Sequence, residues 1–255
     1  MRLNYSSLGT MRKLVPILLG ACLPLLVGCT SIQRSFLFYP THHDGDNGLV
    51  AWRSEGKIIG YSRQVQPPEN VWLMLHGNGG QATDRIYALP SFSEHDSVFI
   101  LEYPGYGTRG DKPSRASFDA AAAEAYTLLR DTFTNIPVCI IGESIGSGPA
   151  CTLATQSPPP EKIVLVVPFD KLASVAAEHV SVLPVSLLLE AKWDNVRSLS
   201  NYQGPVEIFG AQQDTVIPIE HARKLASGIP TAQFHCIPGG HNDWSRTGQV
   251  EIRNP

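Results

Sequence analysis

Short, continuous apolar runs recur along the chain, separated by polar or helical stretches. Runs of this length are typical of strands in a sheet that is covered on both faces. Because a strand needs only a few residues whereas a helix needs ten or more, we interpret these runs as strands. They lie at residues 71–75, 97–101, 138–141, 162–167, 206–209 and 233–237.

Between these runs the apolar positions follow a helical spacing, most clearly at residues 117–133, which are rich in alanine. Further helices are predicted at residues 81–89, 144–155 and 218–226, and from residue 241 onward. Residues 49–53 and 57–64 flank the turn Ser54-Glu55-Gly56 and predict an antiparallel hairpin. Strands that alternate with helices predict an α/β domain, with a mostly parallel sheet of about eight strands and helices on both faces.

The N-terminus has a different pattern. Arg2, Arg12 and Lys13 precede residues 14–28, which carry no charge. A basic stretch followed by an apolar run too short to span a bilayer is typical of a secretory signal peptide. The run ends in Leu26-Val27-Gly28-Cys29, which resembles the lipobox of bacterial lipoproteins.

We therefore expect a signal peptide at residues 1–28, a lipidated Cys29 with a short linker at 29–35, and one domain at 36–255. A plain cleaved signal or a short buried helix is the alternative. The lipid would hold the protein on a membrane of the bacterial cell envelope. Because Thr30 rather than Asp follows Cys29, we expect the outer membrane, facing the periplasm, if the host has two membranes.

Length and charge narrow the classes of protein. A chain of 255 residues fits one large α/β domain, which we expect to be a monomer. The formal net charge is −3, and residues 1–28 hold three basic side chains and no acidic one, so the remainder is more acidic still. An acidic chain without basic blocks argues against nucleic acid as a partner.

Besides Cys22 and Cys29, three cysteines remain. Cys139 lies in an apolar run, which favours a buried free thiol, although a Cys139–Cys151 or a Cys151–Cys236 disulfide is left open. The sequence holds no His/Cys cluster with zinc spacing, so we predict neither a metal nor a cofactor.

Gly142-Glu143-Ser144-Ile145-Gly146 matches the pattern G-x-S-x-G. The pattern alone is weak evidence, but here it follows a predicted buried strand and opens a predicted helix. The two glycines permit a sharp turn that exposes the Ser144 hydroxyl at the helix N-terminus, where the helix dipole favours a developing oxyanion. We predict that Ser144 is a nucleophile; a flexible Ser/Gly turn is the alternative.

Two further residues at strand ends, His241 and Asp214, supply the base and the carboxylate that a serine nucleophile needs. His241 follows the last predicted strand, and histidine can take and return a proton near neutral pH. Asp214 follows the strand at 206–209 and would orient His241, the alternative being a helix-capping role before Pro218. The order Ser, Asp, His over successive strand ends favours a catalytic triad. The backbone N–H groups of Ile145 and Asn78 are the expected oxyanion donors.

Five motifs in this order resemble the α/β-hydrolase superfamily over roughly residues 36 to 250. They are Leu75-His76-Gly77-Asn78-Gly79, Tyr103-Pro104-Gly105-Tyr106-Gly107, Gly142-Glu143-Ser144-Ile145-Gly146, the stretch 210–218 around Asp214, and Gly240-His241-Asn242-Asp243. Within the superfamily, Asn78 and the final His-Asn-Asp resemble a short-lid group that includes protein depalmitoylases. The resemblance implies a lid at about residues 170–200.

The sequence therefore predicts a serine hydrolase that cleaves carboxylic esters or thioesters through an acyl-enzyme on Ser144. The leucines of the expected lid at 183–189 hint at acyl-chain substrates, although they could equally pack on the core. Two alternatives stay open: a peptidase or amidase with the same triad, and a non-catalytic lipoprotein that uses the fold for binding.

Overall fold

The computed structural model describes residues 37–44, 48–179, 191–246, 248 and 250–252. The chain divides into two units, residues 1–38 and 39–255, and the second unit holds every strand and helix named below. The expected signal peptide, Cys29, the linker and the leucines of the expected lid lie outside the described residues. None of the helices within the described ranges is long and apolar enough to cross a membrane.

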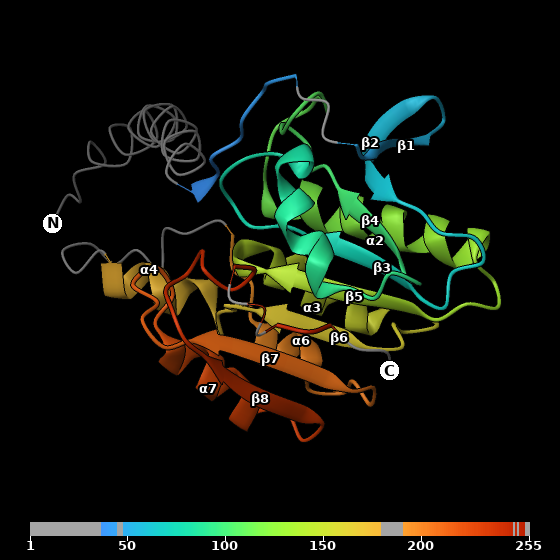
Figure 1. Ribbon diagram of the computed structural model, residues 1–255. Coiled ribbons are helices and arrows are strands. Elements are labelled where there is room, and N and C mark those ends of the chain that lie inside the picture. The colour runs from blue at the N-terminus through green and yellow to red at the C-terminus, as the bar shows by residue number, and fades with distance from the viewer. Residues whose placement is uncertain (1–36, 45–47, 180–190, 247, 249, 253–255) are drawn as a thin grey trace, which may run out of the picture. The chain divides into compact units, whose positions relative to one another are not determined.

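Eight strands form one sheet in the order β1-β2-β4-β3-β5-β6-β7-β8 (Figure 1). β2 runs antiparallel to β1 and β4, whereas all other neighbouring strands are parallel. Their bounds are β1 Val50–Ser54, β2 Lys57–Arg63, β3 Val71–Leu75, β4 Ser97–Leu101, β5 Val138–Glu143, β6 Ile163–Val166, β7 Val206–Ala211 and β8 Ala232–Ile237. The predicted hairpin and the mostly parallel sheet of the α/β class are thereby confirmed.

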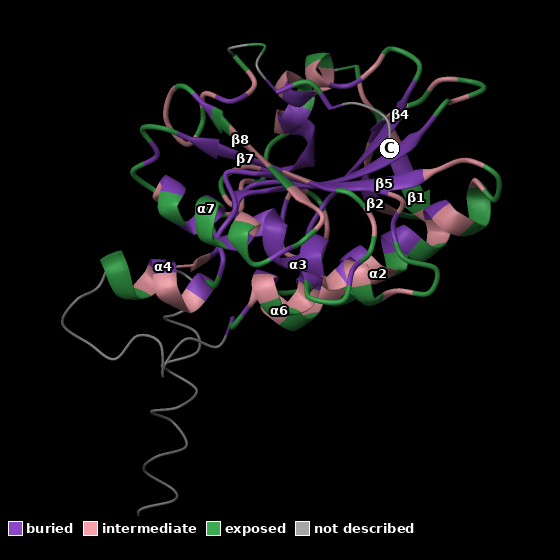
Figure 2. Ribbon diagram, turned by 90° about the horizontal axis from the view of Figure 1, so that it is seen from below, coloured by how far each residue is buried: buried purple, intermediate pink, exposed green. Residues whose placement is uncertain are grey.

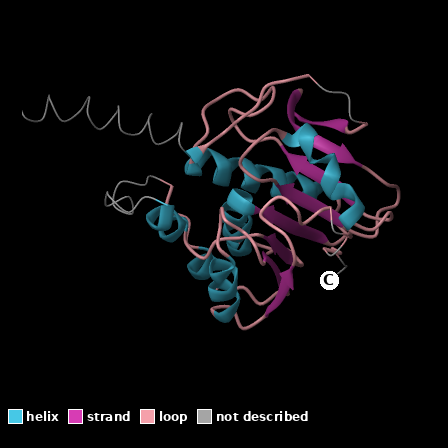
Figure 3. Cartoon of the chain, turned by 60° about the vertical axis from the view of Figure 1, so that its left-hand side comes forward, coloured by secondary structure: helices cyan, strands magenta, loops and turns pink. Residues whose placement is uncertain are grey.

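Helices cover both sides of this twisted sheet (Figure 3). Among the described residues, the α-helices are α2 Arg115–Thr132, α3 Ser147–Thr152, α4 Leu172–His179, α6 Asn195–Leu199 and α7 Ile219–Ser227. The described residues also form three 3-10 helices, namely η1 Ala82–Ser91, η2 Ser144–Gly146 and η3 Leu153–Thr155. Figure 2 shows α2, α3, α6 and α7 on the same side of the sheet.

The central strands are buried completely, which explains why their sequences show no alternation of polar and apolar residues. On β3, Trp72 and Met74 belong to the core that also contains Ala82 and Ala88 of η1. Leu73 lies between them and faces the opposite side, because successive side chains of a strand alternate. The central part of the sheet therefore has apolar side chains on each face.

Two predicted helices differ in the structure. The expected helix from residue 241 onward is wrong: residues 241–246 form turns, with the N–H groups of Asp243 and Arg246 donating to carbonyls three residues earlier. Trp244 explains the difference, because its buried indole donates to Glu143 and holds the segment against the sheet. Residues 144–155 are helical throughout, but as η2, α3 and η3 rather than one α-helix.

Cys139, Cys151 and Cys236 are free thiols, so neither of the two disulfides that the sequence left open is present.

Candidate active site

Ser144 is the first residue of η2 and occupies the strained turn that follows β5. Its φ is +53°, a left-handed conformation that is uncommon for a residue with a side chain. A Cβ at Gly142 would lie 2.6 Å from the Cβ of Ala150, and one at Gly146 would overlap the carbonyl oxygen of Leu75. The two glycines of the motif are therefore needed for the turn to pack this tightly against α3 and the end of β3.

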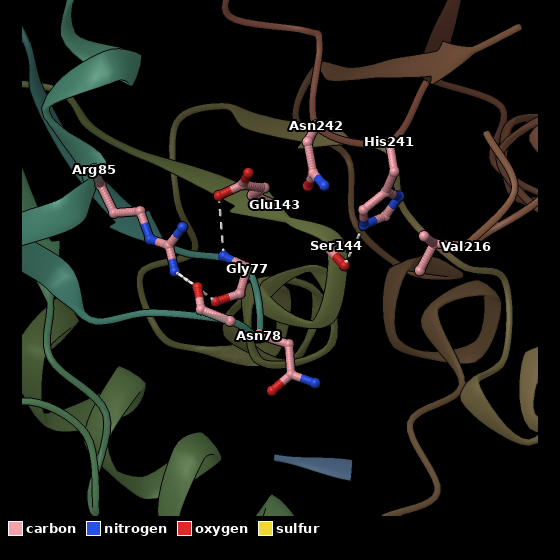
Figure 4. A pocket seen from close by; sticks show the side chains of 9 residues that line it. Gly77, Asn78, Arg85, Glu143, Ser144, Val216, His241 and Asn242 are labelled. Atoms are coloured by element: carbon pink, nitrogen blue, oxygen red, sulfur yellow. Dashed lines mark hydrogen bonds between the residues drawn. The ribbon is translucent and has the colours of Figure 1, made fainter. Parts of the chain in front are cut away.

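Three predicted residues meet at the carboxyl end of the sheet. The Nε2 atom of His241 lies 2.9 Å from the Oγ atom of Ser144 (Figure 4). Its Nδ1 atom lies 2.7 Å from the Oδ2 atom of Asp214. A carboxylate only accepts hydrogen bonds, so it places the imidazole proton on Nδ1 and leaves Nε2 to accept from the Ser144 hydroxyl.

Asp214 is held by its own loop. Its Oδ1 atom accepts hydrogen bonds from the N–H groups of Val216, at 2.9 Å, and Ile217, at 2.8 Å. This leaves Oδ2 for His241, and the Asp214 side chain is only 1% exposed. The loop between β7 and α7 thus fixes the carboxylate before any substrate is present.

A pocket of about 340 Å³ opens beside the Ser144 hydroxyl. Its lining comes from segments that lie far apart in the sequence: Gly77, Asn78, Gly79, Arg85, Glu143, Ser144, Val216, His241 and Asn242. Figure 4 shows the Asn78 side chain directed away from His241, and its Oδ1 atom accepts from the Tyr106 hydroxyl at 2.9 Å. Of the two expected oxyanion donors, Asn78 lines the pocket, and Ile145 is the first residue after Ser144.

Sequence reasoning missed two buried, oppositely charged residues that line this pocket, Arg85 and Glu143. Burial by itself would raise the pKa of Glu143, but the Arg85 cation, the Trp244 indole and the Gly77 amide outweigh it, so that pKa lies below its usual value. Burial by itself would lower the pKa of Arg85, but the Glu143 charge, the Tyr87 hydroxyl and the Asp84 charge together outweigh it, so that pKa lies above its usual value. A signal was present in the sequence: Ala82, Arg85 and Ala88 recur every third residue, which places Arg85 on the buried face of a 3-10 helix.

The other histidines do not reach the pocket. His221, on α7, forms a second buried pair, with its Nδ1 atom 2.6 Å from the Oδ1 atom of Asp170. Lys224 contacts the other oxygen of that carboxylate at 2.7 Å. Within the described ranges no group of three His, Cys, Asp or Glu side chains is placed to hold a metal ion.

No protein-family model matches the chain. An uncharacterized protein of Mycobacterium tuberculosis is 30% identical over 176 residues, which cover 67% of this chain and 62% of that protein. The lysophosphatidylserine lipase of Danio rerio is 27% identical over 187 residues, covering 65% of this chain and 48% of the lipase. The chain thus spans less than two thirds of the length of these relatives. Other relatives carry the name alpha/beta hydrolase in their descriptions.

Among solved structures, an esterase of Pyrococcus furiosus superposes with a TM-score of 0.60 at 13% identity, over 83% of this chain and 97% of the esterase. At such low identity the likeness shows the fold. The chain therefore has the α/β-hydrolase fold, and the descriptions of two relatives name α/β hydrolases.

Proposed function

We propose that the protein is a serine hydrolase that cleaves carboxylic esters or thioesters through an acyl-enzyme on Ser144. The continuous chain of hydrogen bonds from Asp214 through His241 to the Ser144 Oγ atom carries this proposal. A serine on a strained turn, a base and an orienting carboxylate at these distances are what nucleophilic acyl transfer requires. The names of two comparison proteins, a lipase and an esterase, point in the same direction.

In the first half-reaction, Ser144 Oγ attacks the acyl carbonyl carbon while its proton moves to His241 Nε2. Asp214 stabilises the imidazolium that forms. The N–H groups of Asn78 and Ile145 stabilise the tetrahedral oxyanion. When the carbon–oxygen or carbon–sulfur bond breaks, His241 returns the proton to the leaving alcohol or thiol.

In the second half-reaction, a water molecule gives its proton to His241 and attacks the acyl carbon. The tetrahedral intermediate then collapses, the acid leaves and Ser144 recovers its proton. A single imidazole between nucleophile and carboxylate serves both half-reactions, so these residues need no further acid or base.

The proposal is tested by labelling the purified protein with a fluorophosphonate and by measuring hydrolysis of p-nitrophenyl esters and of matched thioesters and anilides. We expect labelling and ester turnover by the wild type and neither by Ser144→Ala. Ser227→Ala is the matched control, because this exposed serine on α7 only donates to the Lys224 carbonyl. A folded wild type that is not labelled would overturn the proposal, and preferential cleavage of anilides would favour an amidase.

We also propose that lipidation of Cys29 anchors the protein in the bacterial cell envelope, on the support of the sequence motif alone. Cys29→Ser should release the protein from the membrane fraction. Cys236→Ser is the control, because Cys236 is an exposed free thiol within the domain. Unchanged membrane association of Cys29→Ser would refute the anchor.

A further inference from the structure

Arg85 reaches the loop that follows β3 and contacts two of its carbonyl groups. Its Nη2 atom lies 3.3 Å from the oxygen of Gly77 and also donates to the oxygen of Gly79. These residues flank Asn78, whose N–H is one of the proposed oxyanion donors. Figure 4 shows the guanidinium directed at this loop from η1, on the side of the loop away from His241.

The Gly77 carbonyl and the Asn78 N–H belong to one peptide unit. A trans peptide is planar, and its C=O and N–H point in opposite directions. A donor that fixes the direction of the Gly77 oxygen therefore fixes the direction of the Asn78 N–H as well. Because the donor is a cation, it also polarises the peptide and strengthens the opposite N–H as a donor.

The same loop is held from its other side by Glu143, which precedes Ser144. The Oε2 atom of Glu143 accepts from the N–H of Gly77 at 3.0 Å. Tyr87 connects the two charges: its hydroxyl accepts from Arg85 Nη1 at 3.2 Å and donates to Glu143 Oε1 at 2.8 Å. The N–H and the carbonyl oxygen of Gly77 are thus each bound by a charged side chain. The Gly77 oxygen has one more contact, with His76 Nδ1 at 2.7 Å.

Burial makes this arrangement rigid. Arg85 is 7% exposed and Glu143 is 5% exposed, so little of either residue is open to water although both line the pocket. A buried pair of opposite charges contributes little net stability compared with apolar residues of equal volume. The pair is better explained by what it holds, namely a backbone loop at the edge of the pocket.

We propose that Arg85 is a positioning residue that orients the Asn78 N–H toward the oxyanion through the Gly77 carbonyl, with Glu143 fixing the same glycine from behind. The inference rests on the proposed function. It adds to the triad a device in which two buried opposite charges, linked through Tyr87, set the geometry of a backbone donor. Removing one oxyanion donor from a serine hydrolase lowers kcat by about 10²–10³, so misorienting one should lower it by at least about tenfold.

The experiment compares Arg85→Met and Arg85→Lys with the wild type, using p-nitrophenyl butyrate and counting active sites by fluorophosphonate titration. We expect kcat per titrated site to fall at least about tenfold in Arg85→Met, with KM changed less than about threefold. Arg85→Lys should recover part of the loss, because an ammonium keeps the charge but lacks the second nitrogen that donates to Tyr87 while Nη2 holds the carbonyls. Inhibition by butylboronic acid, whose adduct carries the oxyanion, should weaken in step with kcat.

Arg63→Met is the matched control, because Arg63 also donates to backbone carbonyls, those of Ser93 and Asp96, but does not line the pocket. It should lower the melting temperature without changing kcat per titrated site. If Arg85→Met does not fold, Arg85→Lys and the isosteric Glu143→Gln carry the same test. An unchanged kcat per titrated site, or a loss confined to KM, would overturn the inference while leaving the proposed function standing. Absence of labelling and turnover in the wild type would overturn both.

Discussion

The replacement Asp214→Asn is the sharpest test of the proposed triad, because the structure shows what the variant keeps. The Oδ1 atom of Asp214 accepts from the N–H groups of Val216 and Ile217, and an asparagine Oδ1 can accept the same two bonds. The loop should therefore keep its shape. The amide NH₂ then occupies the position of Oδ2, which lies 2.7 Å from His241 Nδ1.

An amide NH₂ only donates, so His241 Nδ1 must become the acceptor and the imidazole proton moves to Nε2. That nitrogen lies 2.9 Å from the Ser144 hydroxyl and can then no longer take its proton. Loss of the base and of the carboxylate that stabilises the imidazolium should lower kcat by about 10³–10⁴. This corresponds to about 4–5.5 kcal/mol of transition-state stabilisation at about 1.4 kcal/mol per factor of ten.

The assay is ester turnover per folded molecule, with KM and the thermal unfolding transition measured in parallel. The second Asp–His pair of the molecule provides the control, because Asp170→Asn removes a charge that contacts His221 at 2.6 Å and Lys224 at 2.7 Å, outside the pocket. We expect Asp170→Asn to be less stable and to keep its turnover. Turnover of Asp214→Asn within tenfold of the wild type would refute the reasoning, and a large loss in Asp170→Asn instead would transfer the role to that pair.

Three further predictions concern the scaffold. Gly80→Ala should lower both stability and turnover, because φ is +101° and its Cβ would lie 2.8 Å from atoms of Arg85 and Asp84; calorimetry and kcat per titrated site check this. Leu73→Ala should lower the free energy of unfolding by about 2–5 kcal/mol in denaturant titrations and leave turnover per folded molecule unchanged. Burial, aided by Arg85, lowers the pKa of His76, so the stability it contributes above pH 6.5 is lost as the pH falls below that value. The unfolding midpoint of His76→Gln should therefore change less between pH 7 and pH 5 than that of the wild type, measured in parallel.

The sheet was accessible from sequence because burial on both faces leaves a direct trace. β3 and β4 coincide with the predicted runs, since every residue of each is buried and therefore apolar or small. The predicted helix beyond His241 failed for the opposite reason. Its shape depends on Trp244 reaching Glu143, which lies 101 positions earlier in the chain, and no local pattern records such a contact.

In the candidate site, too, the sequence predicts some residues and misses another. Ser144, Asp214 and His241 each stand directly after a strand, so the topology of a parallel sheet predicts that they gather at one edge. Arg85 stands in a 3-10 helix, and in the loop after β3 it contacts only backbone atoms, the carbonyls of Gly77 and Gly79. Contacts to main-chain atoms place no constraint on the type of residue contacted, so sequence reasoning had only the three-residue spacing of η1 from which to recognise it.

The order of strands in the sheet explains why Asp214, and not Asp170, meets His241. Asp170 follows β6 and Asp214 follows β7, and both carboxylates are buried beside a histidine. β8, which carries His241 after its end, pairs with β7 and not with β6. The loop after β8 is therefore one strand spacing, about 4.8 Å, from the loop after β7 and two spacings from the loop after β6. His241 meets Asp214 for this reason, while α7, which lies between β7 and β8 in the chain, brings His221 to Asp170. The order of strands in the sheet, more than the motif around either aspartate, determines which carboxylate can orient the base next to Ser144.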